Sequence, residues 1–254
     1  MGLLGSLWGG RPTAKAISKQ ATLAKDPYVQ SEYRMAAMNK LLKWQTKESL
    51  LAVLGRFAVV AQSPHWDEEE KVWLKDQLSQ RGELAKETIV EFMRSTGAIT
   101  HPAQVLSRLC SDQEEFVRYL KGALTDRPPE DYRSAQAKRE LILALQATEV
   151  GHAIDCVTVY LADQSDDVRC TAIDAVRARG NPALQKQLVG MLADDKNSPR
   201  VLRHAASAVS ELRLPVGSEL QLQLAQAVAQ NYRVEGGKLK AMAVETGAGS
   251  KPDF

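Results

Sequence analysis

The stretch that decides the fold runs from Val150 to Leu212: VGHAIDCVTVYLADQSDDVRCTAIDAVRARGNPALQKQLVGMLADDKNSPRVLRHAASAVSEL. It contains the same phrase twice: an apolar segment, a Leu-Ala-Asp triplet and an aliphatic-Arg pair. The three parts are His152–Val157, Leu161–Asp163 and Val168–Arg169 in the first copy, and Leu184–Met191, Leu192–Asp194 and Leu202–Arg203 in the second. The triplets lie 31 residues apart and the arginines 34, so the second turn is about three residues longer.

The chemistry of this phrase predicts pairs of antiparallel helices. Ile154, Val157 and Leu161 follow helical spacing and form an apolar stripe. Asp163 suits the turn, because a carboxylate accepts hydrogen bonds from the first amides of the next helix. Gly180-Asn181-Pro182 then ends one helix and begins another. Helix pairs repeated every 30 to 45 residues are typical of an α-solenoid, so we predict an all-α fold of stacked helix pairs.

The first copy resembles the HEAT family, including the bacterial HEAT-like repeats related to phycobilin-lyase subunits. The resemblance rests on Asp163, Val168, Arg169, Ala172 and Val176, which stand at the spacing of that pattern. It implies that the turn aspartate and the arginine form a structural ladder between neighbouring repeats. The second copy departs from the pattern, because the insert at residues 196–199 changes the spacing from Asp to Arg.

Two sets of candidate residues follow from this pattern. The predicted ladder residues, which we expect to order the repeats, are Asp163, Arg169, Asp194, Arg203 and Arg34. The candidate binding surface consists of polar positions on the second helices of the pairs: Asn39, Asp174, Arg177 and Ser207.

The phrase also recurs near the N-terminus, where Tyr33-Arg34 precedes Ala37 and Leu41. We therefore expect the solenoid to cover residues 23–235. Residues 125–130, with the sequence Thr-Asp-Arg-Pro-Pro-Glu, are the strongest interruption and predict a bend between two halves. The glycine-rich residues 236–254 are expected to form a disordered tail.

Residues 1–22 are expected to be a flexible or docking segment. Their first residues, MGLLGSLWGG, match the loose N-myristoylation pattern Met-Gly-x-x-x-Ser. Arg11, Lys15, Lys19 and Lys25 follow with no acidic residue before Asp26, which would support attachment to an anionic membrane surface. The alternative interpretation is a short apolar tag that docks on the first helices.

Composition excludes several classes of protein. The 33 basic and 31 acidic residues give a net charge of +2, whereas a dedicated nucleic-acid-binding protein usually has a larger basic excess. No apolar run approaches the roughly 20 residues of a membrane span. The three cysteines lack CxxC spacing and the four histidines lie far apart. We therefore expect a cytoplasmic protein with no cofactor, no metal and no catalytic residues.

The predicted function is a non-enzymatic scaffold that binds another protein on the solenoid surface. Two alternatives stay open. One is a nucleic-acid-binding or base-processing protein, in which Trp44, Trp66 and Trp73 with Arg56 and Asp67 would form a cleft similar to that of HEAT-like alkylpurine DNA glycosylases. The other is an enzyme that resembles the chromophore lyases.

Overall fold

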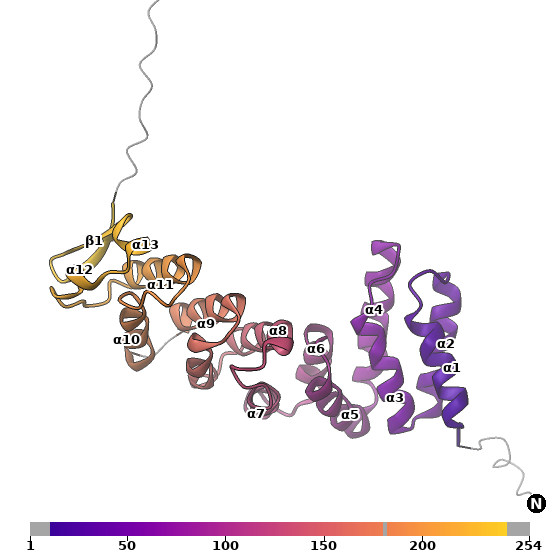
Figure 1. The fold of residues 1–254 in the computed structure, drawn as a ribbon. Coiled ribbons are helices and arrows are strands. Elements are labelled where there is room, and N and C mark those ends of the chain that lie inside the picture. Colours follow the sequence, from indigo (N-terminus) through magenta and orange to yellow (C-terminus); the bar gives the residue numbers. More distant parts are fainter. Residues whose placement is uncertain (1–10, 180–181, 243–254) are drawn as a thin grey trace, which may run out of the picture. The chain divides into compact units, whose positions relative to one another are not determined.

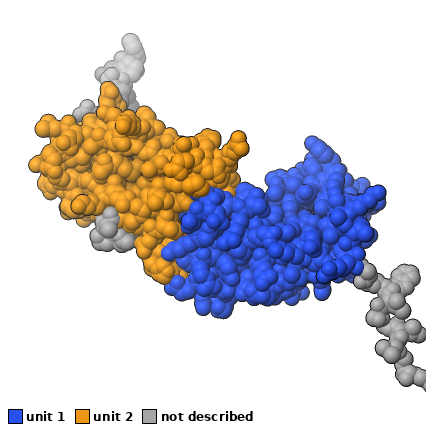
Figure 2. Space-filling model, turned by 60° about the horizontal axis from the view of Figure 1, so that its bottom comes forward, with its two compact units in different colours: residues 1–127 blue, residues 128–254 orange. Residues whose placement is uncertain are grey.

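The computed structural model describes residues 11–179 and 182–242, and most of them are helical (Figure 1). The chain divides into two compact units between Arg127 and Pro128 (Figure 2). This division falls inside the interruption noted at residues 125–130. No helix within the two described ranges is long and apolar enough to cross a membrane.

Unit 1, residues 1–127, consists of helices within its described part. Their bounds are α1 Ala14–Lys25, α2 Ser31–Trp44, α3 Lys47–Leu54, the 3-10 helix η1 Gly55–Ala58, α4 Pro64–Ser79, α5 Gly82–Ser95, α6 Thr100–Leu109 and α7 Gln113–Thr125. Helices pack against the next helix and also against the next but one: α1 contacts α2 and α3, and α4 contacts α5 and α6.

Local sequence explains where these helices begin and which faces they bury. Thr46 and Ser49 form a reciprocal capping box that starts α3. Pro64 stands in the first turn of α4, where no amide is needed for the helical hydrogen bonds. In α5 the apolar residues recur at helical spacing, so one face is buried through Ile89 and Met93.

In its described part, unit 2, residues 128–254, combines helices with a two-stranded sheet. Its elements are η2 Tyr132–Ser134, α8 Ala135–Gln146, η3 Asp155–Ala162, α9 Asp166–Arg179, α10 Pro182–Met191, α11 Pro199–Glu211, α12 Leu220–Gln223, α13 Gln226–Ala229, β1 Tyr232–Glu235 and β2 Lys238–Ala241. The centre of this unit is α9, which packs against α8, η3 and α11. Its buried residues include Val168, Ala172 and Val176, the apolar positions of the repeated phrase.

Two expected helices of unit 2 take a different form. Residues 155–162 form a 3-10 helix in place of the first α-helix of a pair. Val157, Thr158 and Val159 are consecutive β-branched residues, which lowers the preference for an α-helix. The sequence from Ser218 to Gln230 predicts one polar-faced helix that caps the solenoid. The structure splits it into α12 and α13, because the Ala225 N–H donates to the Leu192 carbonyl at 2.9 Å and leaves the helical ladder.

The expectation of a disordered tail from residue 236, and of a chain without strands, is wrong for residues 236–241. Glu235 pairs with Lys238 across the two-residue turn Gly236-Gly237 in an antiparallel hairpin of β1 and β2. Both glycines have positive φ angles, +58° and +70°, the conformation that such a two-residue turn requires. Residues 243–254 lie outside the described residues.

The N-terminal segment is also more ordered than expected from residue 14 onward. Helix α1 begins at Ala14, where the Thr13 hydroxyl accepts a hydrogen bond from the Ala16 N–H at 3.2 Å. Helical structure therefore starts before residue 23, the expected boundary of the repeats. Residues 1–10, with their lipidation pattern, lie outside the described residues.

Candidate binding site

Five buried charged residues lie together in unit 1. Arg34 comes from α2, Arg56 from η1, and Asp67, Glu70 and Lys71 from α4. We call this group the α2–α4 charge cluster. The Arg56 side chain is fully buried, and the other members are at most 7% exposed. Isolated buried charges are very unfavourable, so their pairing determines whether unit 1 is stable.

Arg56 joins the two acidic members of the cluster. Its Nη2 lies 2.6 Å from Oδ1 of Asp67 and 2.9 Å from Oε2 of Glu70. Its Nε also donates to Oε2 of Glu70 at 3.0 Å, and its Nη1 donates to the Val59 carbonyl at 2.8 Å. A planar guanidinium can satisfy several acceptors at once, which a lysine cannot do in this geometry.

The two carboxylates receive further donors from three elements. Arg34 Nη2 lies 2.7 Å from Oε1 of Glu70, and the Ser31 hydroxyl donates to the same oxygen at 2.6 Å. Lys71 Nζ lies 2.6 Å from Oδ2 of Asp67. The Ala61 N–H donates to Oδ1 of Asp67 at 2.8 Å. Every carboxylate oxygen of the cluster therefore has a hydrogen-bond donor.

These contacts hold both acids in the charged form. Burial by itself would raise the pKa of Asp67, but the hydrogen bonds from Lys71, the Ala61 N–H and Arg56 outweigh it and lower the pKa to about 2. Burial opposes the shift of Glu70 as well, and hydrogen bonds from Arg34, Ser31 and Arg56 lower its pKa. Neither acid is suited to general acid or base chemistry near neutral pH, since both keep their charge there.

One alternative from the sequence places Arg56 and Asp67 in a base-binding cleft with three tryptophans. Arg56 and Asp67 do contact each other, but both side chains are buried in the interior of unit 1. Trp66 is 49% exposed, whereas Trp44 and Trp73 are half-buried on α2 and α4. Asp67 therefore serves the charge cluster and does not face a ligand.

A groove opens beside the cluster. It has a volume of about 660 Å³ and is lined by residues 27–32, Arg34 and Met35, and by Gln62, Ser63 and Trp66 at the start of α4. The Gln62 N–H donates to the Pro27 carbonyl at 3.3 Å and joins the two lining segments. We call it the Tyr28–Trp66 groove, because Tyr28 is 79% and Trp66 49% exposed.

The N-terminal ends of two helices also line the groove. Gln30 precedes α2 and Ser63 precedes α4, and neither side chain makes a capping hydrogen bond. The first amides of a helix are donors that a capping side chain or a ligand can satisfy. The groove thus combines exposed aromatic rings with backbone donors on a rigid base.

Arg34, one of the predicted ladder residues, is buried and connects α2 to α4. Its partner, however, is Glu70 within α4 and not an aspartate of a turn. Arg169 in unit 2 stands at the corresponding position of the repeated pattern and also forms hydrogen bonds within the protein. Its Nε donates to the Leu161 carbonyl at 3.0 Å, and its Nη2 donates to the side-chain oxygen of Asn197.

The expected partners of Arg169 are therefore wrong. Asp163 is buried and pairs with the equally buried Lys138 of α8, and it also accepts a hydrogen bond from the Ser165 N–H at 2.8 Å. The second expected partner, Asp194, is replaced by Asn197. The physical reason is the insert at residues 196–199, which brings the buried Asn197 next to α9.

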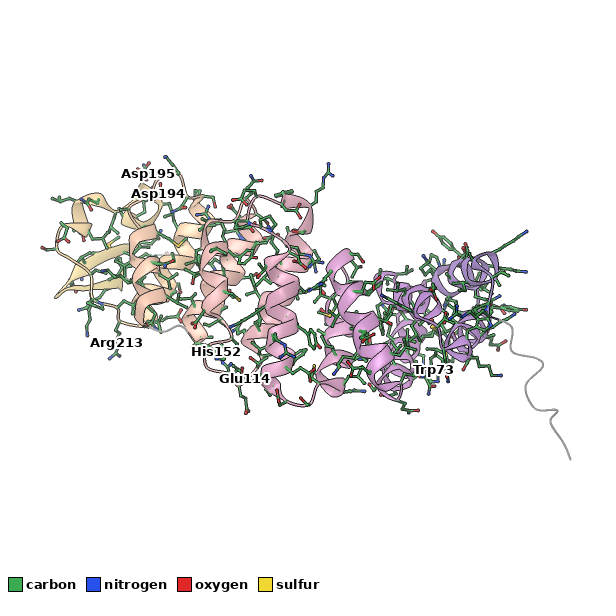
Figure 3. The ribbon with its side chains drawn as sticks, turned by 90° about the horizontal axis from the view of Figure 1, so that it is seen from below. Trp73, Glu114, His152, Asp194, Asp195 and Arg213 are labelled. Carbon is green, nitrogen blue, oxygen red and sulfur yellow. The ribbon has the colours of Figure 1, made fainter. Side chains whose placement is uncertain are left out.

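Asp194 and Arg203 do not form the predicted ladder. Figure 3 shows Asp194 beside Asp195 at the edge of unit 2, and both residues are exposed. The Asp194 carboxylate accepts from the Lys196 N–H at 3.0 Å, a contact within its own turn. Arg203 lies exposed on α11, where the described residues give it no carboxylate partner. Of the three arginines at this position of the pattern, Arg34 and Arg169 are thus bonded to groups of other elements, and Arg203 is exposed.

Three of the four candidate surface residues meet between α9 and α11. Arg177 contacts Asp174 at 3.1 Å and Glu211 at 3.1 Å, while the Ser207 hydroxyl donates to Glu211 at 2.7 Å. His204 lies 3.7 Å from Asp174. These half-buried side chains largely satisfy one another. The fourth candidate, Asn39, is exposed on α2 and donates to the Met35 carbonyl at 3.0 Å.

The described residues hold no group of three side chains suited to bind a metal ion. Cys110, Cys156 and Cys170 are free thiols, with Cys170 buried and the other two half-buried. Burial raises the pKa of Cys110 to about 11 and also raises that of Cys170. A raised pKa lowers the thiolate fraction and therefore the reactivity.

Comparisons with known proteins assign the chain to no family. No family model, curated protein or solved structure matches the chain. Fold and site define a mostly helical protein with a paired buried charge cluster and an adjacent aromatic groove.

Proposed function

We propose that the chain is a protein-binding module that captures an extended peptide segment of its partner in the Tyr28–Trp66 groove. One observation carries this proposal: two exposed aromatic rings flank a groove whose base is fixed by the α2–α4 charge cluster. Tyrosine and tryptophan are the residues most often found at the centre of protein interfaces, because they bury a large area at little entropic cost.

The charge cluster supports binding through preorganisation. Arg34 lines the groove and is held by Glu70, and Ser31 is held by the same carboxylate. A groove that is fixed before the partner arrives loses less conformational entropy on binding. The uncapped ends of α2 and α4 provide amide donors for carbonyl groups of an extended peptide.

In this proposal the helices act as an α-solenoid scaffold, without catalytic chemistry. Hydrogen bonds between alternate helices support the solenoid, because the two bonded residues are about one repeat apart in the sequence. Arg34 and Glu70 are 36 residues apart, Arg177 and Glu211 are 34 apart, and Arg200 and Asp167 are 33 apart. Repeated contacts of this length are what stacked helix pairs produce.

A peptide-selection experiment tests the groove. Peptides would be selected from a random display library on the immobilised full chain, and their Kd measured by fluorescence anisotropy. Tyr28→Ala and Trp66→Ala should each weaken binding by about tenfold or more, the usual loss at an interface hot spot.

Tyr132→Ala is the matched control, because Tyr132 is an aromatic residue of unit 2 that is 64% exposed. It should bind the selected peptides as tightly as the wild type. Equal affinity of both groove variants and the wild type would place the peptide site elsewhere and refute the proposal.

A further inference from the structure

The Tyr28–Trp66 groove presents an unpaired carboxylate to solvent. Glu32 lines the groove in the first turn of α2, its side chain is exposed, and the described residues give its carboxylate no partner. Arg34, the other charged residue of the lining, is only 4% exposed and is held by Glu70. A ligand that enters the groove therefore meets a free carboxylate and, along the described lining, no free cation.

Two further acids stand beside the aromatic rings of the groove. Asp26 is half-buried next to Tyr28, and its Oδ1 accepts a hydrogen bond from the Tyr28 N–H at 2.9 Å. Glu69 follows Trp66 by three positions in α4, so the two side chains are neighbours on the helix surface. The Glu69 carboxylate is exposed and lies 3.1 Å from Nε2 of His65. Acidic groups thus flank both rings.

The two segments that form the groove and its base carry net negative charge. Residues 26–35 and 56–71 contain six acidic and three basic residues, a net charge of −3 in a chain whose total is +2. The three bases are all buried and paired in the α2–α4 charge cluster: Arg34, Arg56 and Lys71. Lys25, an exposed base close in sequence, lies against Gly55 of η1, outside the groove lining.

The helix ends in the groove do not reverse this charge. The N-terminus of a helix corresponds to about half a positive charge and by itself favours anions. Both helices, however, already have an acid in the first turn, Glu32 in α2 and Asp67 in α4. One carboxylate more than offsets half a charge, so the amides of these ends remain hydrogen-bond donors in an acidic surrounding.

The exposed rings add a second attraction for cations. Tyr28 is 79% and Trp66 49% exposed. The face of an aromatic ring is negative and attracts a guanidinium or ammonium group within about 6 Å, most strongly when the ring is tryptophan. Arginine suits such a site better than lysine, because its planar group stacks on a ring and can bind a carboxylate through two parallel hydrogen bonds.

On the basis of the proposed peptide-binding function, we infer that the segment bound in the Tyr28–Trp66 groove carries an arginine. Its guanidinium stacks on Trp66 and pairs with the Glu32 carboxylate, while the backbone of the segment accepts hydrogen bonds from the helix ends. An acidic segment fits the groove worse, because its carboxylates would be repelled by Glu32 and Glu69 and the buried arginines are already paired.

Peptides selected from the random library on the full chain test this arginine, with Kd measured by fluorescence anisotropy. The selected sequences should be enriched in arginine over the unselected library. Citrulline in place of that arginine keeps the shape without the charge and should weaken binding about fivefold or more, and lysine should recover part of the loss. Glu32→Gln should weaken binding of the arginine peptide similarly and leave the citrulline peptide almost unchanged, because the two changes remove the same interaction.

Glu48→Gln is the matched control variant. Glu48 is an exposed acid in the first turn of α3, so this substitution makes the same change of net charge at the same position of another helix. The variant should bind the arginine peptide as tightly as the wild type. Equal losses in Glu32→Gln and Glu48→Gln would show an effect of net charge alone and overturn the inference.

The results distinguish the arginine from the peptide site itself. Peptides whose affinity depends on Tyr28 and Trp66 but is the same with arginine and citrulline would overturn the inference and leave the peptide site intact. Selected peptides without arginine, or full affinity of the arginine peptide for Glu32→Gln, would have the same meaning. Affinity unchanged in both Tyr28→Ala and Trp66→Ala would overturn the inference and the proposed function together, and so would a selection that yields no binding peptide.

Discussion

Arg56 and Asp67 face each other in the interior of unit 1, with Nη2 of the arginine 2.6 Å from Oδ1 of the aspartate. The same Nη2 reaches Glu70 at 2.9 Å, so one guanidinium fixes two positions of α4 relative to η1. The groove formed by Tyr28 and Trp66 lies beside this contact. The base of the groove therefore depends on these buried ion pairs.

Arg56→Ala should strongly destabilise unit 1. The substitution removes the one guanidinium that Asp67 and Glu70 share, and removing one member of a buried pair costs about 3 to 5 kcal/mol. Urea unfolding followed by circular dichroism measures the loss. Arg200→Ala is the control, because its ion pair with Asp167 is exposed and should contribute about 1 kcal/mol or less. Equal small losses in both variants would refute the structural role of the cluster.

Acid should weaken unit 1 between about pH 4 and pH 2. The pKa of Asp67 is about 2 in the folded chain against an ordinary value of 3.8. A lowered folded-state pKa adds stability above the unfolded value, and this stability is lost as the pH falls through the folded value. The urea unfolding free energy should fall over this range, and less steeply in Asp67→Asn. Asp195→Asn, at an exposed carboxylate, should follow the wild type; the same slope in all three proteins would contradict the assignment.

Arg169→Ala should lower the melting temperature through the loss of its contacts to Leu161 and Asn197. Unsatisfied hydrogen-bond partners of a charged group cost roughly 1 to 3 kcal/mol. Arg169→Lys should recover only part of this, since lysine lacks the planar fork. Arg203→Ala, at the corresponding but exposed position of α11, should change stability by about 0.5 kcal/mol or less. If Arg169→Ala kept full stability but lost partner binding, the residue would belong to a binding surface.

The native thiols should react slowly with a thiol reagent at mildly alkaline pH. Cys170 is 4% exposed and should be the slowest, while burial raises the pKa of Cys110 to about 11 and keeps it protonated. Unfolding in denaturant should release all three thiols at the free-cysteine rate. Rapid reaction of all three in the native protein would contradict the burial described for them.

The sequence predicted that the chain is mostly helical, because helix formation depends on local pattern. Arg34, Ala37 and Leu41 follow a spacing that places them on one face of a helix. Partner choice was not predictable in the same way. Asn197 lies in an insert that broke the repeat, so only the tertiary structure shows that it replaces Asp194 as the partner of Arg169.

The charge cluster was missed because its signals have an ordinary local explanation. The acidic residues 67–70 predict the first turn of a helix, where the helix dipole favours negative charge, and this local explanation gives no sign that Asp67 and Glu70 are buried. The hairpin was missed for a different reason. Gly236-Gly237 was taken as part of a tail, although two glycines between short alternating segments also fit a tight hairpin turn.

The most direct measurement of the central claim is hydrogen exchange of the full chain with and without a library-selected peptide. The account predicts slower exchange at residues 27–35 and 60–67, the segments that line the Tyr28–Trp66 groove and its base. The backbone amides around Asp174, Arg177 and Ser207 in α9 and α11 should exchange at the same rate with and without the peptide. Protection confined to α9 and α11, with none at residues 27–35, would contradict the proposed site.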